Sequence, residues 1–65
     1  IGSEAQQRVW AAVGKLSPTQ REVLLLRVNE GLSYKEIAEV ASTTEGAARV
    51  HYHNALRTVK ENLND

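Results

Sequence analysis

The 65-residue sequence contains no cysteine and no methionine, and it has only one proline and four glycines. Without cysteine there is no disulfide bond, thiol nucleophile or Cys-ligated zinc, and this composition fits a reducing compartment such as the cytosol. The strongest hydrophobic run, the aliphatic residues 23–26, is far shorter than the roughly 20 residues that a membrane span needs. The sequence therefore predicts a cytoplasmic protein that does not interact with a membrane.

The chain is also short and carries no net charge. Its length allows one domain, and a core this small leaves little room for a water-excluded substrate cavity. Eight Lys and Arg residues balance eight Asp and Glu residues, so there is no overall attraction to nucleic acid or anionic lipid. A glycine-rich phosphate loop and a Ser-His-Asp order are both absent. We expect no enzymatic activity, no cofactor and no small-molecule substrate.

The domain is predicted to occupy residues 4–65. Residues 1–3, which read Ile-Gly-Ser, are predicted to be a cloning scar or a disordered start. The absence of methionine agrees with a piece taken from a longer protein.

The spacing of hydrophobic residues, with proline and glycine at the expected helix boundaries, predicts an all-α fold. Period-two alternation and Asn-Gly or Asp-Gly hairpin signals are absent. Ser17 with Gln20, and Ser33 with Glu36, have the spacing of a capping box at a helix start, and Thr44 can cap the last helix. We expect helices at residues 4–15, 18–30, 34–41 and 45–63.

The apolar residues of these segments predict how the helices pack. Residues 23–28 give the second helix a broad apolar face, so it is the expected central helix, and Gly31 suits a left-handed residue after its end. Trp10 is expected to anchor the core between the first two helices, the alternative being that it faces a partner protein. The predicted inner line of the last helix contains Ala48, Tyr52, Ala55, Leu56, Val59 and Leu63.

The last two predicted helices have the sequence form of a helix-turn-helix, in which a short turn joins a short helix to a longer one. Residues 42–60 contain the basic residues Arg49, Arg57 and Lys60 but only one acidic residue, Glu45. Basic residues on the outer face of the longer helix favour contact with DNA, with Arg57 and Lys60 placed for phosphates. The pattern leaves open a helical protein-interaction module without DNA binding.

Arg49 and the two histidines of this helix are candidates for contact with DNA or for packing within the domain. Arg49 can form two hydrogen bonds with guanine O6 and N7 in a major groove. His51 and His53 are two residues apart, about 200° around a helix, and so cannot chelate one metal ion. We therefore expect no metal site, with His53 as an exposed contact residue and His51 as a half-buried packing residue.

Three motifs carry a resemblance to a known family. They read QREVLLLR at residues 20–27, EGLSYKEIA at residues 30–38 and TEG at residues 44–46. In these motifs the chain resembles region 4 of bacterial RNA polymerase sigma factors, particularly the extracytoplasmic-function (ECF) group. The LuxR-type regulators share several of these residues and are the alternative family. Their segment before Gly-Leu-Ser is usually one residue shorter and their last helix ends earlier, so both features favour the sigma factors.

The resemblance implies a DNA-binding role at promoters. It implies that the domain binds the minus-35 promoter element with its last helix in the major groove, while it is bound to core RNA polymerase through the β-flap. An anti-sigma factor is a further partner that the family allows. By position, the residues implied to contact bases are Arg49, Val50, His53 and Asn54. Those implied to contact phosphates are Arg21, Tyr34 and Lys35. Family members often carry more basic residues on this helix, so this chain is expected to read a different sequence or to bind weakly.

Overall fold

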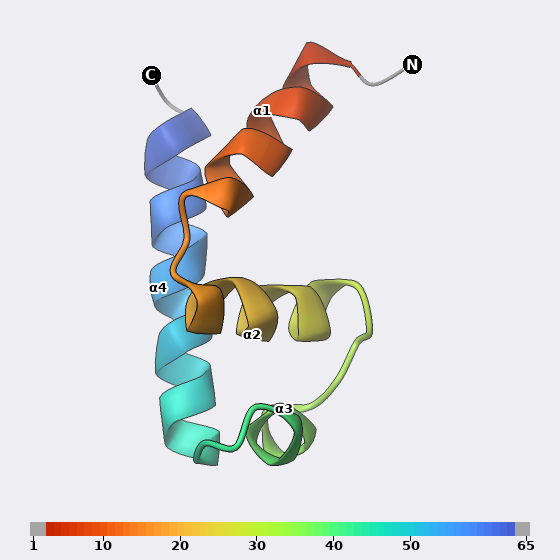
Figure 1. The fold of residues 1–65 in the computed structure, drawn as a ribbon, viewed down its shortest axis with the longest axis vertical. Helices are drawn as coiled ribbons and strands as arrows, with labels where there is room; N and C mark the ends of the chain where they lie inside the picture. The colour runs from red at the N-terminus through yellow and green to blue at the C-terminus, as the bar shows by residue number, and fades with distance from the viewer. Residues whose placement is uncertain (1–2, 64–65) are drawn as a thin grey trace.

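The computed structural model describes residues 3–63, which form four α-helices and no β-strand in this range (Figure 1). The helices are α1 (Glu4–Gly14), α2 (Pro18–Val28), α3 (Tyr34–Val40) and α4 (Glu45–Leu63). The predicted all-α fold is confirmed, and each helix boundary lies within two residues of its predicted position. Residues 1 and 2, on which most of the predicted scar falls, lie outside the described residues. The Ser3 side chain accepts a hydrogen bond from the Gln6 amide and caps α1.

Side-chain caps begin three of the helices where the sequence predicts them. The Ser17 hydroxyl accepts the Gln20 amide at 3.2 Å, and the Gln20 side chain accepts the Ser17 amide at 3.4 Å. Ser33 and Glu36 repeat this reciprocal pair at 3.1 and 2.9 Å. The Thr44 hydroxyl accepts an amide from the first turn of α4 at 3.0 Å. Because these caps satisfy amides that lack a partner within the helix, local sequence is enough to define where the helices start.

Two residues between the helices adopt a left-handed backbone conformation. Gly31 has a φ of 67°, as predicted. Ser42, in the turn between α3 and α4, has a φ of 55°, which costs a residue with a side chain roughly 1–2 kcal/mol. The next amide, that of Thr43, donates to the Ala38 carbonyl at 2.9 Å and closes the end of α3 in a Schellman arrangement. The turn geometry therefore outweighs the local preference of serine.

The core is organised around α4, which packs against each of the other three helices. The prediction that the second helix is central is wrong. At 19 residues α4 is about 28 Å long, so one helix contributes residues to both of the buried clusters of the core. One buried cluster joins α1, the following loop, α2 and α4 and contains Val13, Leu16, Leu24 and Ala55. A second joins α2, α3 and α4 and contains Val23, Ile37 and Ala48.

The predicted inner line of α4 is confirmed for most of its members. Ala48 and Ala55 are fully buried, whereas the residues Tyr52, Val59 and Leu63 are half-buried. Tyr52 packs against both clusters and connects them. Leu56 is 40% exposed, so its predicted place in the core is wrong.

Glu36→Gln is expected to remove a part of the stability that the wild type has at neutral pH and loses in acid. The Ser33 backbone amide, followed by the Ser33 hydroxyl, donates to the Glu36 carboxylate and lowers its pKa. Because the pKa is lowered on folding, this stabilisation is complete above the unfolded-state pKa of about 4.3 and is lost as the pH falls through the folded-state value. Urea unfolding at about pH 6 and about pH 3 should show a larger loss of stability for the wild type than for Glu36→Gln.

The chain contains its own control for this substitution. Gln20 occupies the equivalent position in the capping box of α2, so glutamine is compatible with the hydrogen-bond geometry. Equal losses of stability in the two proteins would contradict a contribution from the Glu36 charge.

Candidate nucleic-acid interface

The helix-turn-helix predicted from the sequence is present in the structure. It consists of α3, a four-residue turn at residues 41–44, and α4, whose first turns lie beside α3 (Figure 1). Ile37 and Ala48 hold the two helices together through the second buried cluster, and Thr44 caps α4. The side of α4 that faces away from this cluster is therefore free to present side chains.

Five of the six DNA-contact residues predicted on α4 are exposed on its outer side. Arg49, Val50 and His53 are exposed, with Val50 at 57%, whereas Asn54 is half-buried. Arg57 and Lys60 are also exposed, and the helical repeat places both within about 80° of Arg49 around the axis. These five residues thus share the outward side of α4, as predicted, whereas Asn54 lies at its half-buried edge, and the role of each residue remains a prediction.

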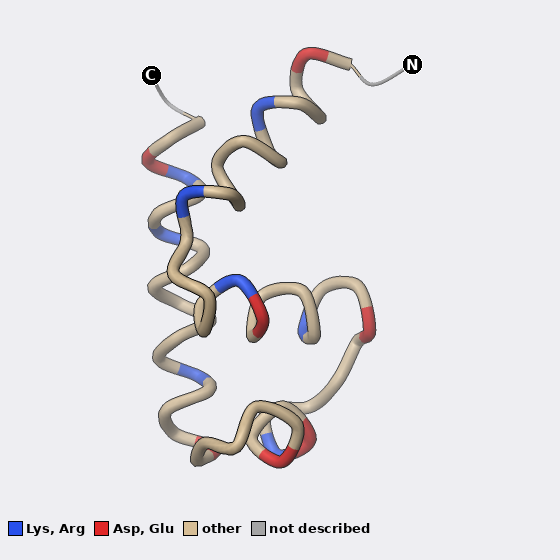
Figure 2. Tube along the Cα trace, in the orientation of Figure 1, with Lys and Arg blue, Asp and Glu red and all other residues tan. Residues whose placement is uncertain are grey.

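Basic residues are distributed along α4, and its two acidic residues lie in the first turn, at Glu45, and near the end, at Glu61 (Figure 2). Arg49 and Glu45 are 4.0 Å apart, and their side chains are 55% and 58% exposed. An ion pair this long and this exposed contributes little to stability. The guanidinium of Arg49 is therefore weakly held by Glu45 and is accessible to an anionic or polar ligand.

The sequence did not predict a cluster of cations and rings that links α2, α3 and α4. The guanidinium carbons of Arg27 and Arg49 lie 4.7 and 5.0 Å from the centre of the Tyr34 ring. The ring of Tyr52 meets the Tyr34 ring edge-on at 6.0 Å. We call these four residues the Tyr34 cluster. Arg27 is its unpredicted member, because no helical spacing relates a residue at the end of α2 to the starts of α3 and α4.

The remaining predicted contact residues lie outside this cluster. Arg21 is exposed at the start of α2, and its guanidinium donates to the Leu16 carbonyl at 3.2 Å. Lys35 is exposed in the first turn of α3. His51 is half-buried, as predicted, and the exposed His53 ring approaches the edge of Tyr52 at 5.8 Å between ring centres.

Among residues 3–63, no group of three or more His, Asp or Glu side chains is placed to hold a metal ion. His51 and His53 differ in exposure, as their opposite positions on the helix require. None of the helices described for this chain combines the length and the hydrophobicity needed to cross a membrane.

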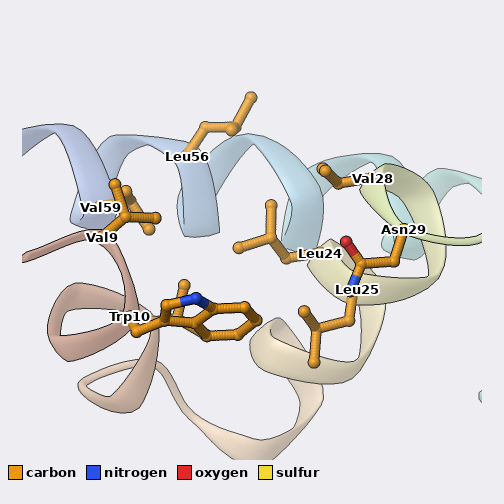
Figure 3. Close-up of a pocket in the computed structure, with 9 residues that line it drawn as sticks. Val9, Trp10, Leu24, Leu25, Val28, Asn29, Leu56 and Val59 are labelled. Atoms are coloured by element: carbon orange, nitrogen blue, oxygen red, sulfur yellow. The ribbon is translucent and has the colours of Figure 1, made fainter. Parts of the chain in front are cut away.

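An apolar groove of about 240 Å³ opens between α1, α2 and α4 (Figure 3). Leu24 and Leu25 form part of its lining, and the Trp10 side chain lies next to them. Several lining side chains are partly exposed to solvent, namely Val9 (40%), Trp10 (54%), Val28 (60%) and Leu56 (40%). Exposed apolar side chains gathered in one concavity are typical of a surface that binds another protein.

This groove explains why two predicted core residues are not buried. The prediction that Trp10 anchors a core between the first two helices is wrong, because α1 packs mainly against α4 and hardly touches α2. Hydrogen bonds join the α1 region to the end of α4, including one of 2.8 Å that the Lys15 ammonium donates to the Asn62 side-chain oxygen. Trp10 and Leu56 consequently line an open groove rather than a closed core.

The architecture, in which a short turn joins α3 to the longer α4, defines the chain as a helix-turn-helix domain. Residues 6–59 match the family model described as Sigma-70, region 4, and the chain belongs to that family. The match agrees with the resemblance found in the motifs, and it does not support the LuxR-type alternative.

The chain is similar to two ECF sigma factors. The ECF RNA polymerase sigma factor SigD of Mycobacterium tuberculosis (strain H37Rv) is 46% identical over 48 residues, which are 74% of this chain and 23% of that protein. The ECF RNA polymerase sigma factor BldN of Streptomyces coelicolor is 41% identical over 54 residues, which are 83% of this chain and 20% of that protein. The chain therefore spans about a fifth to a quarter of the length of these relatives. No solved structure matches the chain at a significant level.

Proposed function

We propose that this chain is the part of an ECF sigma factor that binds the minus-35 element of a promoter, with α4 in the major groove. The observation that carries this proposal is the exposed outer face of α4, on which Arg49 lies one helical turn after the start of the helix. Membership of the sigma-70 region 4 family supports the same role. The proposed role is DNA recognition during transcription initiation in the cytoplasm, without catalysis.

The proposed base contacts follow from the chemistry of the four side chains near the start of α4. Arg49 offers two donors for guanine O6 and N7, and Asn54 offers a donor and an acceptor for adenine. Val50 exposes its methyl groups and suits the methyl group of thymine. His53, one turn after Arg49, is the fourth proposed base contact.

The proposed phosphate contacts flank these residues. Arg57 and Lys60 lie about 12 and 16 Å beyond Arg49 along α4, further from the start of the helix than the proposed base contacts. Arg21 on α2 and Lys35 on α3 are exposed and basic. Together with Tyr34, these residues are proposed to set the position of the domain on the duplex rather than to read its sequence.

Selection from a pool of duplexes with a randomised central segment tests the proposal directly. The chain should enrich a defined motif at low salt, where phosphate contacts contribute most to affinity. Fluorescence anisotropy with the enriched duplex and a scrambled one should then show tighter binding to the enriched duplex. Failure to enrich any motif would favour the alternative of a helical protein-interaction module.

We also propose that the apolar groove binds core RNA polymerase, through the β-flap. The groove lies between α1, α2 and α4, and the exposed apolar side chains of Trp10 and Val28 would be covered by such a partner. Burial of apolar area is the main favourable contribution to protein association. An anti-sigma factor is the other proposed partner of this domain.

Val28→Asp is expected to weaken binding to a purified β-flap segment about tenfold or more, because it places an unpaired charge inside a desolvated contact. Val40→Asp is the matched control, since both valines are 60% exposed and both lie near the end of a helix, but Val40 is on α3 outside the groove. Biolayer interferometry with immobilised flap segment measures both variants, and circular dichroism checks that each is folded. Equal effects of the two substitutions would contradict docking in the groove.

A further inference from the structure

The Tyr34 ring is fixed by the hydrophobic core, although it lies at the edge of the DNA-binding face. Tyr34 is the first residue of α3 and is half-buried against the second cluster, which contains Val23 and Ile37. The edge-to-face contact with Tyr52 of α4 further restricts its orientation. The ring is therefore a rigid surface between the two helices of the helix-turn-helix.

Two arginines lie against this ring, and they differ in how they are held. Arg27 is half-buried, and its guanidinium also donates to the Leu32 carbonyl at 2.9 Å, so it is fixed from two sides. Arg49 is exposed, and among residues 3–63 its guanidinium contacts the ring and, at 4.0 Å, the Glu45 carboxylate. Because an exposed ion pair of this length contributes little, the ring is the more rigid of the two groups that the described part of the chain places beside the Arg49 guanidinium.

We infer that Tyr34 is a positioning residue that fixes the Arg49 side chain for base recognition. This inference rests on the proposed function of α4 and adds a residue that acts through another one. An arginine on a free helix surface loses rotamer freedom when it binds a base, whereas an arginine already placed against a rigid ring loses less. The ring contact thus favours specific recognition by Arg49, and Arg27 fixes the loop beside the same ring.

Positioning of Arg49 by the Tyr34 ring differs from a direct contact between the Tyr34 hydroxyl and a phosphate. A hydroxyl that binds phosphate would act equally on all duplexes, whereas a platform for Arg49 would act on discrimination between bases. Tyr34→Phe removes the hydroxyl and keeps the ring, and Tyr34→Leu removes both. Comparison of these two variants therefore separates the two roles.

The contact itself is tested in the free chain by proton NMR. The δ-methylene protons of Arg49 should be shifted upfield by the ring current, relative to those of Arg57 in the same spectrum. Arg57 is an internal control, because it is exposed on the same helix and makes no ring contact among the described residues. Identical shifts for the two arginines would overturn the inference without the need for any variant.

The effect of Tyr34 on base discrimination is tested with two duplexes. One is the enriched duplex, and the other differs from it at the single base pair whose preference is lost in Arg49→Ala. Tyr34→Leu should reduce the affinity ratio of the two duplexes about two- to fivefold, as expected for an exposed cation–π contact, and Tyr34→Phe should leave the ratio unchanged. In an Arg49→Ala background Tyr34→Leu should have no further effect on the ratio. In an Arg57→Ala background its effect on the ratio should be retained in full.

The outcomes distinguish failure of this inference from failure of the proposed function. If Tyr34→Leu weakens both duplexes equally in every background, Tyr34 is only structural and the inference is overturned, while α4 remains a reading helix. If the wild-type chain enriches no motif, the proposed function fails and the inference fails with it. Loss of the ratio in Tyr34→Phe would instead assign the effect to the hydroxyl and overturn the platform role.

Discussion

Replacing Ile37 with alanine is expected to unfold most of the chain at room temperature. Ile37 is 0% exposed and is one of the two largest fully buried side chains, at the point where α2, α3 and α4 meet. Truncating a buried isoleucine to alanine costs about 2–5 kcal/mol. A core of this size supplies in total only about 3–5 kcal/mol. Circular dichroism should show a large loss of helix, and urea should unfold any remaining folded fraction at much lower concentration.

Val40→Ala is the matched control for this prediction. Val40 lies three residues later on the same helix and is 60% exposed. Its truncation should change the free energy of unfolding by no more than about 0.5 kcal/mol. An unfolding midpoint for Ile37→Ala equal to that of Val40→Ala would show that α3 is not packed on α4.

Arg49→Ala is expected to lower affinity for the enriched duplex by about 1–3 kcal/mol and to relax the preference at one base pair. The reason is that Arg49 lies in the first turns of α4, where a reading helix meets base edges, and its side chain is only weakly paired with Glu45. Anisotropy titrations with the enriched duplex and its single-base-pair variants measure both effects. A uniform loss over all duplexes would show that Arg49 contacts only the backbone.

Arg57→Ala and Lys60→Ala provide the contrast. Their affinity losses should be similar for all duplexes, and each should lower the slope of log affinity against log salt by about one unit. The same titrations at two salt concentrations measure this slope. If Arg49→Ala and both of these variants all bind like the wild type, α4 is not a reading helix, and the protein-interaction alternative should replace the proposed function.

The sequence by itself determined the helices and their caps. The reciprocal bonds of Ser17 with Gln20 and of Ser33 with Glu36 join residues three apart, so they form in any chain that begins a helix there. The polar face of α4 also follows from local spacing, because the repeat of a helix alone decides which residues share a side. Arg49 and His53 are exposed as predicted for that reason.

The tertiary structure decided what depends on where helices cross. The sequence placed Trp10 in the core because its spacing fits an inner face, but α1 leans on α4 rather than α2, and Trp10 lines an open groove instead. The left-handed Ser42 follows from the turn that joins two packed helices, and serine itself does not favour it. Arg27, Tyr34 and Arg49 meet only because α2, α3 and α4 converge on one buried cluster. Contacts between residues far apart in sequence have no local period, so only the packing of the helices could bring these three side chains together.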